Sequence, residues 1–312
     1  MALDVCVVGE INPDLILYGL PKQLKPEEEI LVDGFRLTLG SSSAIFAHNL
    51  AVLGTQVAIV SKIGNDALGK MATDWLANAG VDLTRVRPAA SGTGTGLSVI
   101  LNQPEHRFIL TYPGTMFELA FGDLDIEFIF SARHFHVSSY FLHRALRPRM
   151  AELFRQAKGR GLSTSLDTND DPEGKWGEDL LEALPFVDIL FPNGREAKKI
   201  ARIDDLNLAT EKLSRICKFV VVKLGAAGAV VRNGNEQWRR NGMRVRSKDM
   251  VGAGDSFDAG YIHRFLQGAS PQECLEYADI AGAFSTTHEG GTEAFRDRKA
   301  VERFFNSHLG TR

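Results

Sequence analysis

The residues best suited to chemistry lie between Asp249 and Phe257, in the stretch DMVGAGDSF. Gly252 and Gly254 are separated by Ala253 alone, which lets the backbone turn tightly and direct successive N–H groups at one anion. A helical pattern follows at once, and the positive end of its dipole points at the same place. The spacing therefore predicts a site where main-chain amides hold a phosphate.

Asp255 stands at the start of that helix, where the dipole and free N–H groups favour an ionised carboxylate. Two roles are open to it, a helix N-cap or a general base. Most single Asp residues before a helix are caps, but a cap alone does not require two glycines. With Asp249 six residues upstream, the pattern favours the general base.

The elements that must position this stretch form one large α/β domain or two modest ones, since the chain has 312 residues. A content of 44% apolar and 24% charged residues supplies a sizeable core. Short runs rich in Val and Ile alternate with segments of helical period, which is typical of a parallel sheet covered by helices. Strands are predicted at residues 5–8, 57–63, 134–138, 163–167, 189–192, 219–224 and 229–232. Helices are predicted at residues 44–53, 71–79, 147–159 and 254–267.

Two segments fit this alternation poorly. Prolines and a glycine break residues 15–39 into short extended pieces, and residues 93–112 form two predicted strands joined by a polar turn at 103–106. These segments form either a separate β-rich flap that closes over a ligand or surface excursions of the main sheet. The sequence leaves both open.

The composition excludes several classes of function. The 36 basic and 39 acidic residues give a net charge of -3, without the basic excess of a nucleic-acid or membrane-surface binder. Cys6, Cys217 and Cys274 are scattered, which excludes a disulfide framework or a zinc site and favours a reducing cytosol. No apolar run is long enough to span a membrane, and the N-terminus, with Asp4 and Glu10 inside it, is predicted to be a strand and turn. We expect a cytoplasmic protein with no nucleic-acid or membrane partner.

Several motifs, in order along the chain, resemble those of the ribokinase-like carbohydrate kinases, also called the pfkB or minor-phosphofructokinase family. The stretch from Asp249 to Phe257 is similar to the family signature D-T-x-G-A-G-D-x-F, with Met250 in place of Thr. Weaker matches cover most of the chain. They lie at residues 9–14, 40–54, 64–69, 193–196 and 222–228.

The resemblance implies a three-layer α/β/α sandwich with a mostly parallel central sheet. It implies one kinase domain over residues 1–312, with a small β-sheet lid formed by about 12–39 and 91–114. The implied reaction is ATP-dependent transfer of the γ-phosphoryl group to a hydroxyl of a sugar or related alcohol, with Mg²⁺. Asp255 would accept the hydroxyl proton, and the amides of Gly252, Ala253 and Gly254 would form the anion hole. Relatives often pair through the lid, so a homodimer is one expectation.

The resemblance also implies binding residues, and position at the lid base adds Arg107 and Tyr112. Acceptor contacts are expected from Asn12, Asp14, Gly40, Ser41, Ser42, Arg107, Tyr112 and Asp255. ATP contacts are expected from Asn193, Lys223, Gly225, Gly228, Gly252, Gly254 and Ala283. Asn193 and Glu196, expected on adjacent turns of one helix face, would hold Mg²⁺, partly through water. Asp249 would serve a monovalent cation such as K⁺.

Departures from the family pattern concern the acceptor. Ser41 replaces the second glycine of the usual pair and Ile45 the following Asn, so the hydroxyl contacts must differ from those of ribokinase itself. After the D-T-N at 167–169, where many relatives carry an Arg, the chain continues with Asp170 and Asp171. Two carboxylates there would disfavour an anionic acceptor. A small neutral sugar or polyol is therefore predicted, although Arg107 could meet an anion.

Two alternatives remain open from the residues. A nucleoside kinase of the same fold is favoured by aromatic groups near the acceptor, namely Phe46, Tyr112 and Phe117. A non-catalytic sugar sensor on a kinase scaffold is disfavoured because Asp249, Asp255 and the intact G-A-G are all present.

Other patterns are assigned structural roles. Residues 64–71 superficially match a P-loop, but Met71 offers no hydroxyl for Mg²⁺ and Asp66 would intrude on a phosphate. Residues 92–97 lack the third glycine of a dinucleotide-binding turn and lead into a strand. His134 and His136 are predicted to be ordinary strand residues. Trp176 either closes one wall of the site or packs at a helix start.

Overall fold

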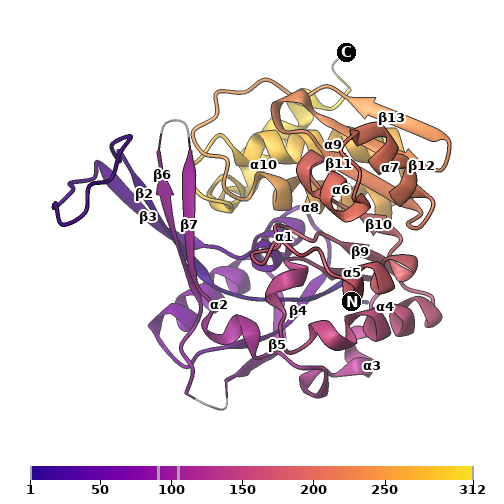
Figure 1. Cartoon of the computed structure of the whole chain (residues 1–312), viewed down its shortest axis with the longest axis horizontal. Coiled ribbons are helices and arrows are strands. Elements are labelled where there is room, and N and C mark those ends of the chain that lie inside the picture. Colours follow the sequence, from indigo (N-terminus) through magenta and orange to yellow (C-terminus); the bar gives the residue numbers. More distant parts are fainter. Residues whose placement is uncertain (1, 90–91, 104–105, 311–312) are drawn as a thin grey trace.

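The computed structural model describes residues 2–89, 92–103 and 106–310 of the chain. Within these residues nine strands form the main sheet: β1 (Val5–Val8), β4 (Val57–Ile63), β5 (Asp82–Pro88), β8 (His134–Val137), β9 (Ser163–Leu166), β10 (Ile189–Leu190), β11 (Phe219–Lys223), β12 (Ala229–Asn233) and β13 (Glu236–Arg240). Their order is β13-β12-β11-β10-β9-β8-β1-β4-β5 (Figure 1). From β11 to β5 neighbouring strands are parallel, and β12 and β13 add antiparallel. The predicted mostly parallel sheet is confirmed.

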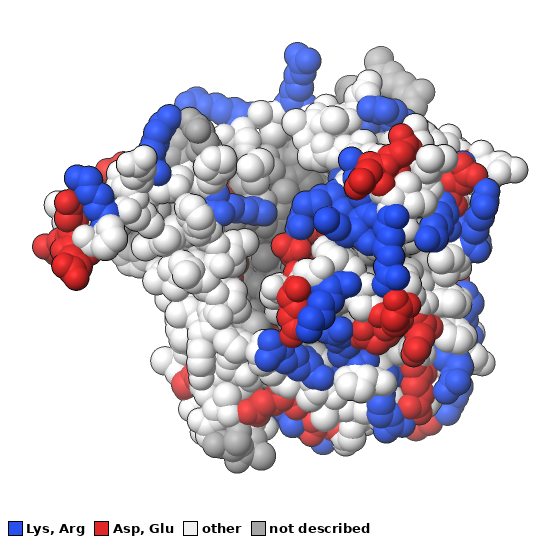
Figure 2. Space-filling view, in the orientation of Figure 1, with Lys and Arg blue, Asp and Glu red and all other residues white. Residues whose placement is uncertain are grey.

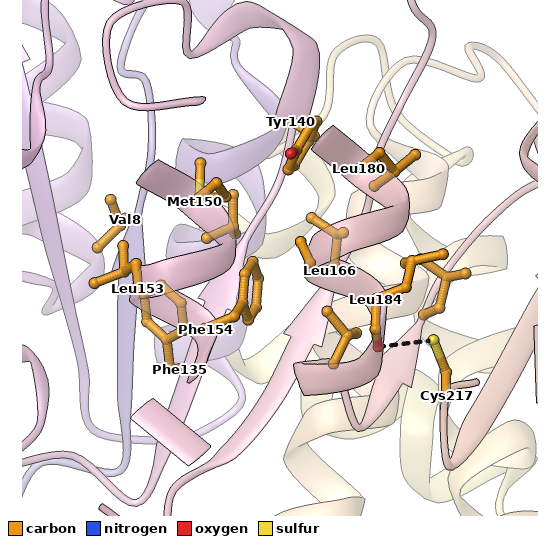
Figure 3. Packing of buried hydrophobic residues seen from close by; sticks show 14 of the residues in the cluster. Val8, Phe135, Tyr140, Met150, Leu153, Phe154, Leu166, Leu180, Leu184 and Cys217 are labelled. Carbon is orange, nitrogen blue, oxygen red and sulfur yellow. Dashed lines mark hydrogen bonds between the residues drawn. The ribbon is translucent and has the colours of Figure 1, made fainter. Parts of the chain in front are cut away.

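Helices cover both faces of this sheet and complete a three-layer sandwich. They are α1 (Ser42–Val52), α2 (Ala67–Ala79), α3 (Ile126–Ile129), α4 (Met150–Gly159), α5 (Glu178–Ala183), α6 (Gly194–Ala201), α7 (Leu206–Ser214), α8 (Ala253–Leu266), α9 (Pro271–Ser285) and α10 (Arg298–His308). On one face, Leu153 and Phe154 of α4 pack with Phe135 of β8 (Figure 3). On the other face, Phe46 of α1 and Leu275 of α9 belong to a second buried cluster. Of the helices described, none has the length and hydropathy needed to cross a membrane.

The central strand β1 shows why the sheet is buried on both sides. Cys6 and Val8 belong to the first cluster, whereas Val5 and Val7 belong to the second. Successive side chains of a strand point to opposite faces of the sheet. An uninterrupted apolar run therefore packs against the helices on both faces.

The sequence patterns missed the strands β5 and β13 and the first turn of α2. Both strands carry charged residues at the sheet edges, and an edge strand lacks the apolar run of a central one. Helix α2 begins at Ala67 because Asp66 caps it, accepting a hydrogen bond from Gly69 N at 2.8 Å. The same carboxylate accepts one from Thr95 N at 2.7 Å. The carboxylate of Asp66 therefore occupies the helix N-terminus at which a P-loop would bind phosphate. This agrees with the rejection of a P-loop at residues 64–71.

A second, smaller sheet stands apart from the main one and is called the lid below (Figure 1). Its strands are β2 (Pro13–Tyr18), β3 (Gly34–Leu39), β6 (Leu97–Asn102) and β7 (Arg107–Tyr112), in the order β3-β2-β6-β7. The prediction of a separate flap is confirmed, and the alternative of excursions from the main sheet is wrong. Ser91, Pro104 and Glu105, which belong to the predicted lid and its turn, lie outside the described residues.

The two faces of the lid differ in character. Asp14, Ser98 and Thr111 are cross-strand neighbours and share the inner face. The outer face is apolar throughout and consists of Leu15, Leu17, Phe35, Leu37, Val99, Leu101, Phe108, Leu110 and Tyr112. Tyr112 therefore points away from the side that carries Thr111, because adjacent strand residues face opposite ways.

The two strand histidines lie inside the main sheet as predicted. His134 and His136 are fully buried and share the hydroxyl of Ser165, with 2.7 Å from His134 Nε2 and from His136 Nδ1 to its Oγ. Burial lowers the pKa of His134 to about 3. Both rings are thus neutral hydrogen-bonding residues of the core.

Candidate active site

A cavity of about 1520 Å³ opens between the inner face of the lid and the carboxyl ends of the parallel strands. It reaches from Ile109 and Thr111 of the lid, past Gly252 and Gly254, to Gly228 and Ala283. Figure 2 shows the molecule hollowed between the lid and the main body, with charged side chains gathered on the body beside the hollow. Open α/β sheets place their ligands at this edge.

The loop before α8 has the conformation that its glycines predict. Gly252 occupies the N-cap position of α8 in the left-handed region, with φ 71°, and no side chain caps the helix there. A Cβ on Gly252 would lie 2.5 Å from the Cα of Gly291. The alternative role of Asp255 as the helix cap is wrong, because Asp255 lies in the first turn, after the cap. The amide end of α8 is thus left facing the cavity.

Asp255 is a buried carboxyl group at the edge of the cavity. Burial raises its pKa to about 6, and the charge of Asp167 acts in the same direction. Lys223 and the hydroxyl of Ser42 oppose this rise. A carboxylate with a pKa near neutrality is suited to accept a proton from a hydroxyl.

The first strand of the lid, β2, contributes residues expected to contact the acceptor. Asp14 is buried and lines the cavity, and burial together with the charge of Asp255 raises its pKa to about 7. Asn12 also lines the cavity, and its buried Oδ1 has no partner among the described residues. Gly40 does not line the cavity. A Cβ there would lie 2.0 Å from Asp14 Oδ1, so this glycine makes room for Asp14.

Ser41 and Ser42 follow at the start of α1 and differ in role. Ser41 caps the helix: its hydroxyl donates to the carbonyl of Glu10 at 2.6 Å and accepts from Ala44 N at 3.2 Å. Both serines line the cavity, but only the hydroxyl of Ser42 faces Asp255. Ser42 is thus the residue of this pair that is available to an acceptor.

Glu10 is a site residue that the sequence patterns did not predict. It is buried, lines the cavity, and accepts hydrogen bonds from Ser43 Oγ at 2.7 Å and Ser139 Oγ at 2.8 Å, with His143 Nε2 at 3.4 Å. Burial alone would raise its pKa, but His143 and Ser43 outweigh it and hold the pKa below its usual value. The one signal in the sequence was an acidic residue two positions after an apolar strand. Its partners come from segments far along the chain.

Gly225, Gly228 and Ala283, which are expected to contact ATP, all line the cavity at the end away from the lid. Gly228 has φ 90°, and a Cβ there would lie 2.0 Å from the carbonyl oxygen of Arg240, so the turn after β11 requires a glycine. Lys223 also lines the cavity, but its ammonium is bound to Asp167 Oδ2 at 2.6 Å and to Asp258 Oδ2 at 3.0 Å.

Asn193 and Glu196 form a capping box at the start of α6. Asn193 Oδ1 accepts from Glu196 N at 2.9 Å, and Glu196 Oε2 accepts from Asn193 N at 2.8 Å. The expectation that both lie on turns of one helix face is wrong, because Asn193 is the cap. Burial, with the charge of Asp167, raises the pKa of Glu196 to about 7. Both residues line the cavity.

These oxygen donors fit a magnesium ion that keeps its water. Among the described residues no group of three His, Cys, Asp or Glu side chains could hold a metal. Mg²⁺ is usually bound through one or two carboxylates plus substrate phosphates and water, not by an all-protein cage. Glu196 and Asn193 offer a carboxylate and an amide oxygen for binding through substrate phosphates and water.

Asp249 links the lid to the loops below it. Its carboxylate accepts from Tyr18 Oη at 3.0 Å, Val251 N at 3.0 Å and Gly290 N at 3.1 Å. These three donors connect the lid to the loops below it, and a monovalent cation such as K⁺ at Asp249 stays a prediction. Asp249 does not line the cavity, although its neighbour Met250 does.

Several expected side chains lie elsewhere. Tyr112 does not line the cavity, because it faces outward from the lid. Phe46 is buried and stacked on His136, and Trp176 packs against Phe141 in the core. Phe117 does line the cavity.

Arg107 lines the cavity as expected, and four arginines that were not predicted also line it, namely Arg144, Arg147, Arg195 and Arg244. The guanidinium of Arg144 lies 4.3 Å over the ring of Phe117, and Arg147 is paired with Asp179. The helix predicted from residue 147 begins only at Met150, and Arg147 lies in the 3-10 turn before it.

A glycine-rich loop at the start of α8, a buried carboxyl group directly after it and a cavity beneath the lid have the features that phosphoryl transfer requires. The chain matches the pfkB family of carbohydrate kinases over residues 2–298 and belongs to that family. It is an ATP-dependent sugar kinase with a ribokinase-like fold.

Known proteins are similar to this chain over nearly its whole length. It is 29% identical to an ATP-dependent ribose-1-phosphate kinase of Halopiger xanaduensis, covering 93% of this chain and 94% of that one. It is 26% identical to a ribokinase of Haemophilus influenzae, covering 97% and 99%. Its fold is that of Arabidopsis thaliana ribokinase complexed with ribose and ATP, with a TM-score of 0.82, 24% identity and coverage of 97% and 99%.

Proposed function

We propose that Asp255 is the general base that takes the proton from the acceptor hydroxyl as its oxygen attacks the γ-phosphoryl group of ATP. The observation that carries this is a buried carboxyl group in the first turn of α8, inside the cavity and directly after the Gly252–Gly254 loop. The hydroxyl O–H bond breaks to Asp255, the new O–P bond forms, and the P–O bond to ADP breaks. The amides of Gly252, Ala253 and Gly254 stabilise the charge on the transferred group.

The rest of the cavity divides between the two substrates. Asn12, Asp14 and Ser42 present polar atoms to the acceptor, while the nucleotide lies along Gly225, Gly228 and Ala283. Mg²⁺ would neutralise phosphate charge, with Asn193 and Glu196 orienting its water. Supporting this, the fold also matches a ribokinase II-like protein of E. coli in complex with ATP and Mg²⁺ (TM-score 0.86, 23% identity, coverage of 98% and 100%).

The two carboxylates behind the prediction of a neutral acceptor, Asp170 and Asp171, both line the cavity, and both have partners. Asp171 accepts hydrogen bonds from the backbone N–H groups of Glu173, Lys175 and Trp176, so it organises its own loop. Asp170 is paired with Arg195 at 2.7 Å. These partners offset the two charges in part, and a small neutral sugar or polyol stays a prediction.

The nucleoside alternative also loses support, since Phe46 and Tyr112 do not reach the cavity. We retain the cytoplasm as the proposed location, with support from three thiols that are free and buried.

The direct test is ADP release from Mg·ATP across a panel of neutral sugars, polyols, nucleosides, sugar acids and sugar phosphates. We expect turnover with at least one sugar, and loss of that turnover in the Asp255→Asn variant. Turnover of the sugar that survives this substitution would reject Asp255 as the base.

The pH dependence of kcat/KM reports the pKa values of the essential groups in the free enzyme. Because the base must be ionised and the pKa of Asp255 is raised to about 6, activity is expected to fall about tenfold per pH unit below pH 6 and to level off above it. Asp14, with a pKa of about 7, broadens this limb. An Asp with an unperturbed pKa would place the acid limb of the kcat/KM profile near pH 4. A profile that stays flat down to pH 4.5 contradicts the assignment.

We also propose that two copies pair through the outer faces of their lids. Phe35 is 70% exposed, and Phe108, Leu110 and Tyr112 are each more than half exposed. A second copy presents the same apolar face, so a two-fold pairing buries both. We expect light scattering to give twice the mass of one chain, and Leu110→Glu to give a monomer. Leu208→Glu, at a comparably exposed leucine of α7, is the matched control and should stay dimeric; a monomeric wild type rejects the pairing.

A further inference from the structure

Lys223 lies directly behind the loop that receives the phosphoryl group. It ends β11, and its nearly buried ammonium is held by Asp167, which follows β9, and by Asp258 of α8. A Cβ on Gly254 would lie 3.5 Å from its Nζ, so the ammonium faces the first turn of α8. One side chain therefore ties two strand ends of the sheet to the helix that carries Asp255.

The charges that act on Asp255 come from four different parts of the fold. Three are acidic groups and one is an ammonium, namely Glu10 after β1, Asp14 of the lid, Asp167 after β9, and Lys223 of β11. Asp258, on α8 itself, is paired with Lys223. Burial raises the pKa of Asp258, and the charge of Lys223 acts against this rise. In such a surrounding the ionised form of Asp255 depends on the nearby positive charge.

We propose that Lys223 is a positioning residue of the transfer, which fixes the first turn of α8 and places a positive charge behind the Gly252–Gly254 loop. The inference rests on Asp255 being the base. It differs from a direct contact with ATP, because the ammonium is already bound to Asp167 and Asp258 at 2.6 and 3.0 Å. The buried ammonium stabilises negative charge at the Gly252–Gly254 loop, and it favours the ionised form of Asp255.

The test is the pH profile of kcat/KM in paired variants of the full chain. Lys223→Met removes the charge that lowers the pKa of Asp255, so the acid limb should move up by about one pH unit and kcat at pH 7 should fall about 10–100-fold. Asp167→Asn removes a charge that raises it, so the limb should move down. Lys223→Arg keeps the charge and should restore the limb toward that of the wild type.

The two opposite shifts separate this role from simple damage to the fold. A lower melting temperature with an unmoved acid limb in both Lys223→Met and Asp167→Asn would overturn the proposal. A raised KM for ATP with an unmoved limb would also overturn it, because it would make Lys223 a nucleotide contact. If Lys223→Met does not fold, Asp167→Asn still tests the sign of the shift. Loss of activity in the wild type with every acceptor would instead count against the proposed function.

Discussion

Asp255→Asn is expected to lower kcat by about 10²–10⁴-fold while ATP still binds, because the amide cannot accept the hydroxyl proton but keeps the size of the carboxyl group. The residue is buried in the first turn of α8 and does not cap the helix. Replacing it should therefore lower the reaction rate more than the free energy of unfolding. Steady-state ADP release gives kcat, and calorimetric titration gives the affinity for ATP. The contribution of Asp255 to the acid limb, near pH 6, should be absent from this variant, which leaves that of Asp14 near pH 7.

Asp297→Asn is the matched control for this substitution. Asp297 also stands at a helix start, but it is the N-cap of α10, accepts from Lys299 N and Ala300 N, and does not line the cavity. We expect nearly wild-type kcat from it, since Asn also caps helices well. Activity of Asp255→Asn within a few-fold of the wild type, with Asp297→Asn alike, would leave Asp255 with a structural role only.

Gly252→Ala is the second substitution with a large expected effect. Gly252 has φ 71°, and a Cβ there would lie 2.5 Å from Gly291 Cα and 3.2 Å from Ile45 Cγ2. The loop must therefore move, and its amides no longer converge on one point. We expect kcat/KM to fall by about 10²-fold or more and the free energy of unfolding to fall by about 1–3 kcal/mol. Kinetics and denaturant titration measure the two effects separately.

Gly268→Ala separates the cost of the backbone conformation from the cost of the clash. Gly268 follows the other end of α8 with φ 79°, and an added Cβ meets nothing within 4 Å. It should lose about 1–2 kcal/mol for the left-handed conformation alone and keep its activity, because it is not part of the cavity lining. Equal activity losses in both variants would show that the Gly252 effect is not specific to the anion loop.

Features that depend on neighbouring residues could be predicted before the fold was known. The alternation of apolar runs and helical segments predicts a parallel sheet, since each central strand is buried on both faces. The Gly252–Gly254 spacing predicts the anion loop, because the tight turn and the dipole of the following helix are local properties. The capping box of Asn193 and Glu196 was equally local, and its N-x-x-E spacing could have shown it.

Which residues meet in the cavity depends instead on how distant segments pack. Tyr112 differs from Thr111 by one step along the strand, and only the pairing of β6 with β7 places one inward and the other outward. The three donors on Asp171 are local in sequence but depend on a loop conformation that has no periodic signal. Glu10 meets Ser139 across 129 positions of the chain, and Lys223 meets Asp167 across 56. Such pairs form where the carboxyl ends of different strands converge, and no spacing along the chain encodes that convergence.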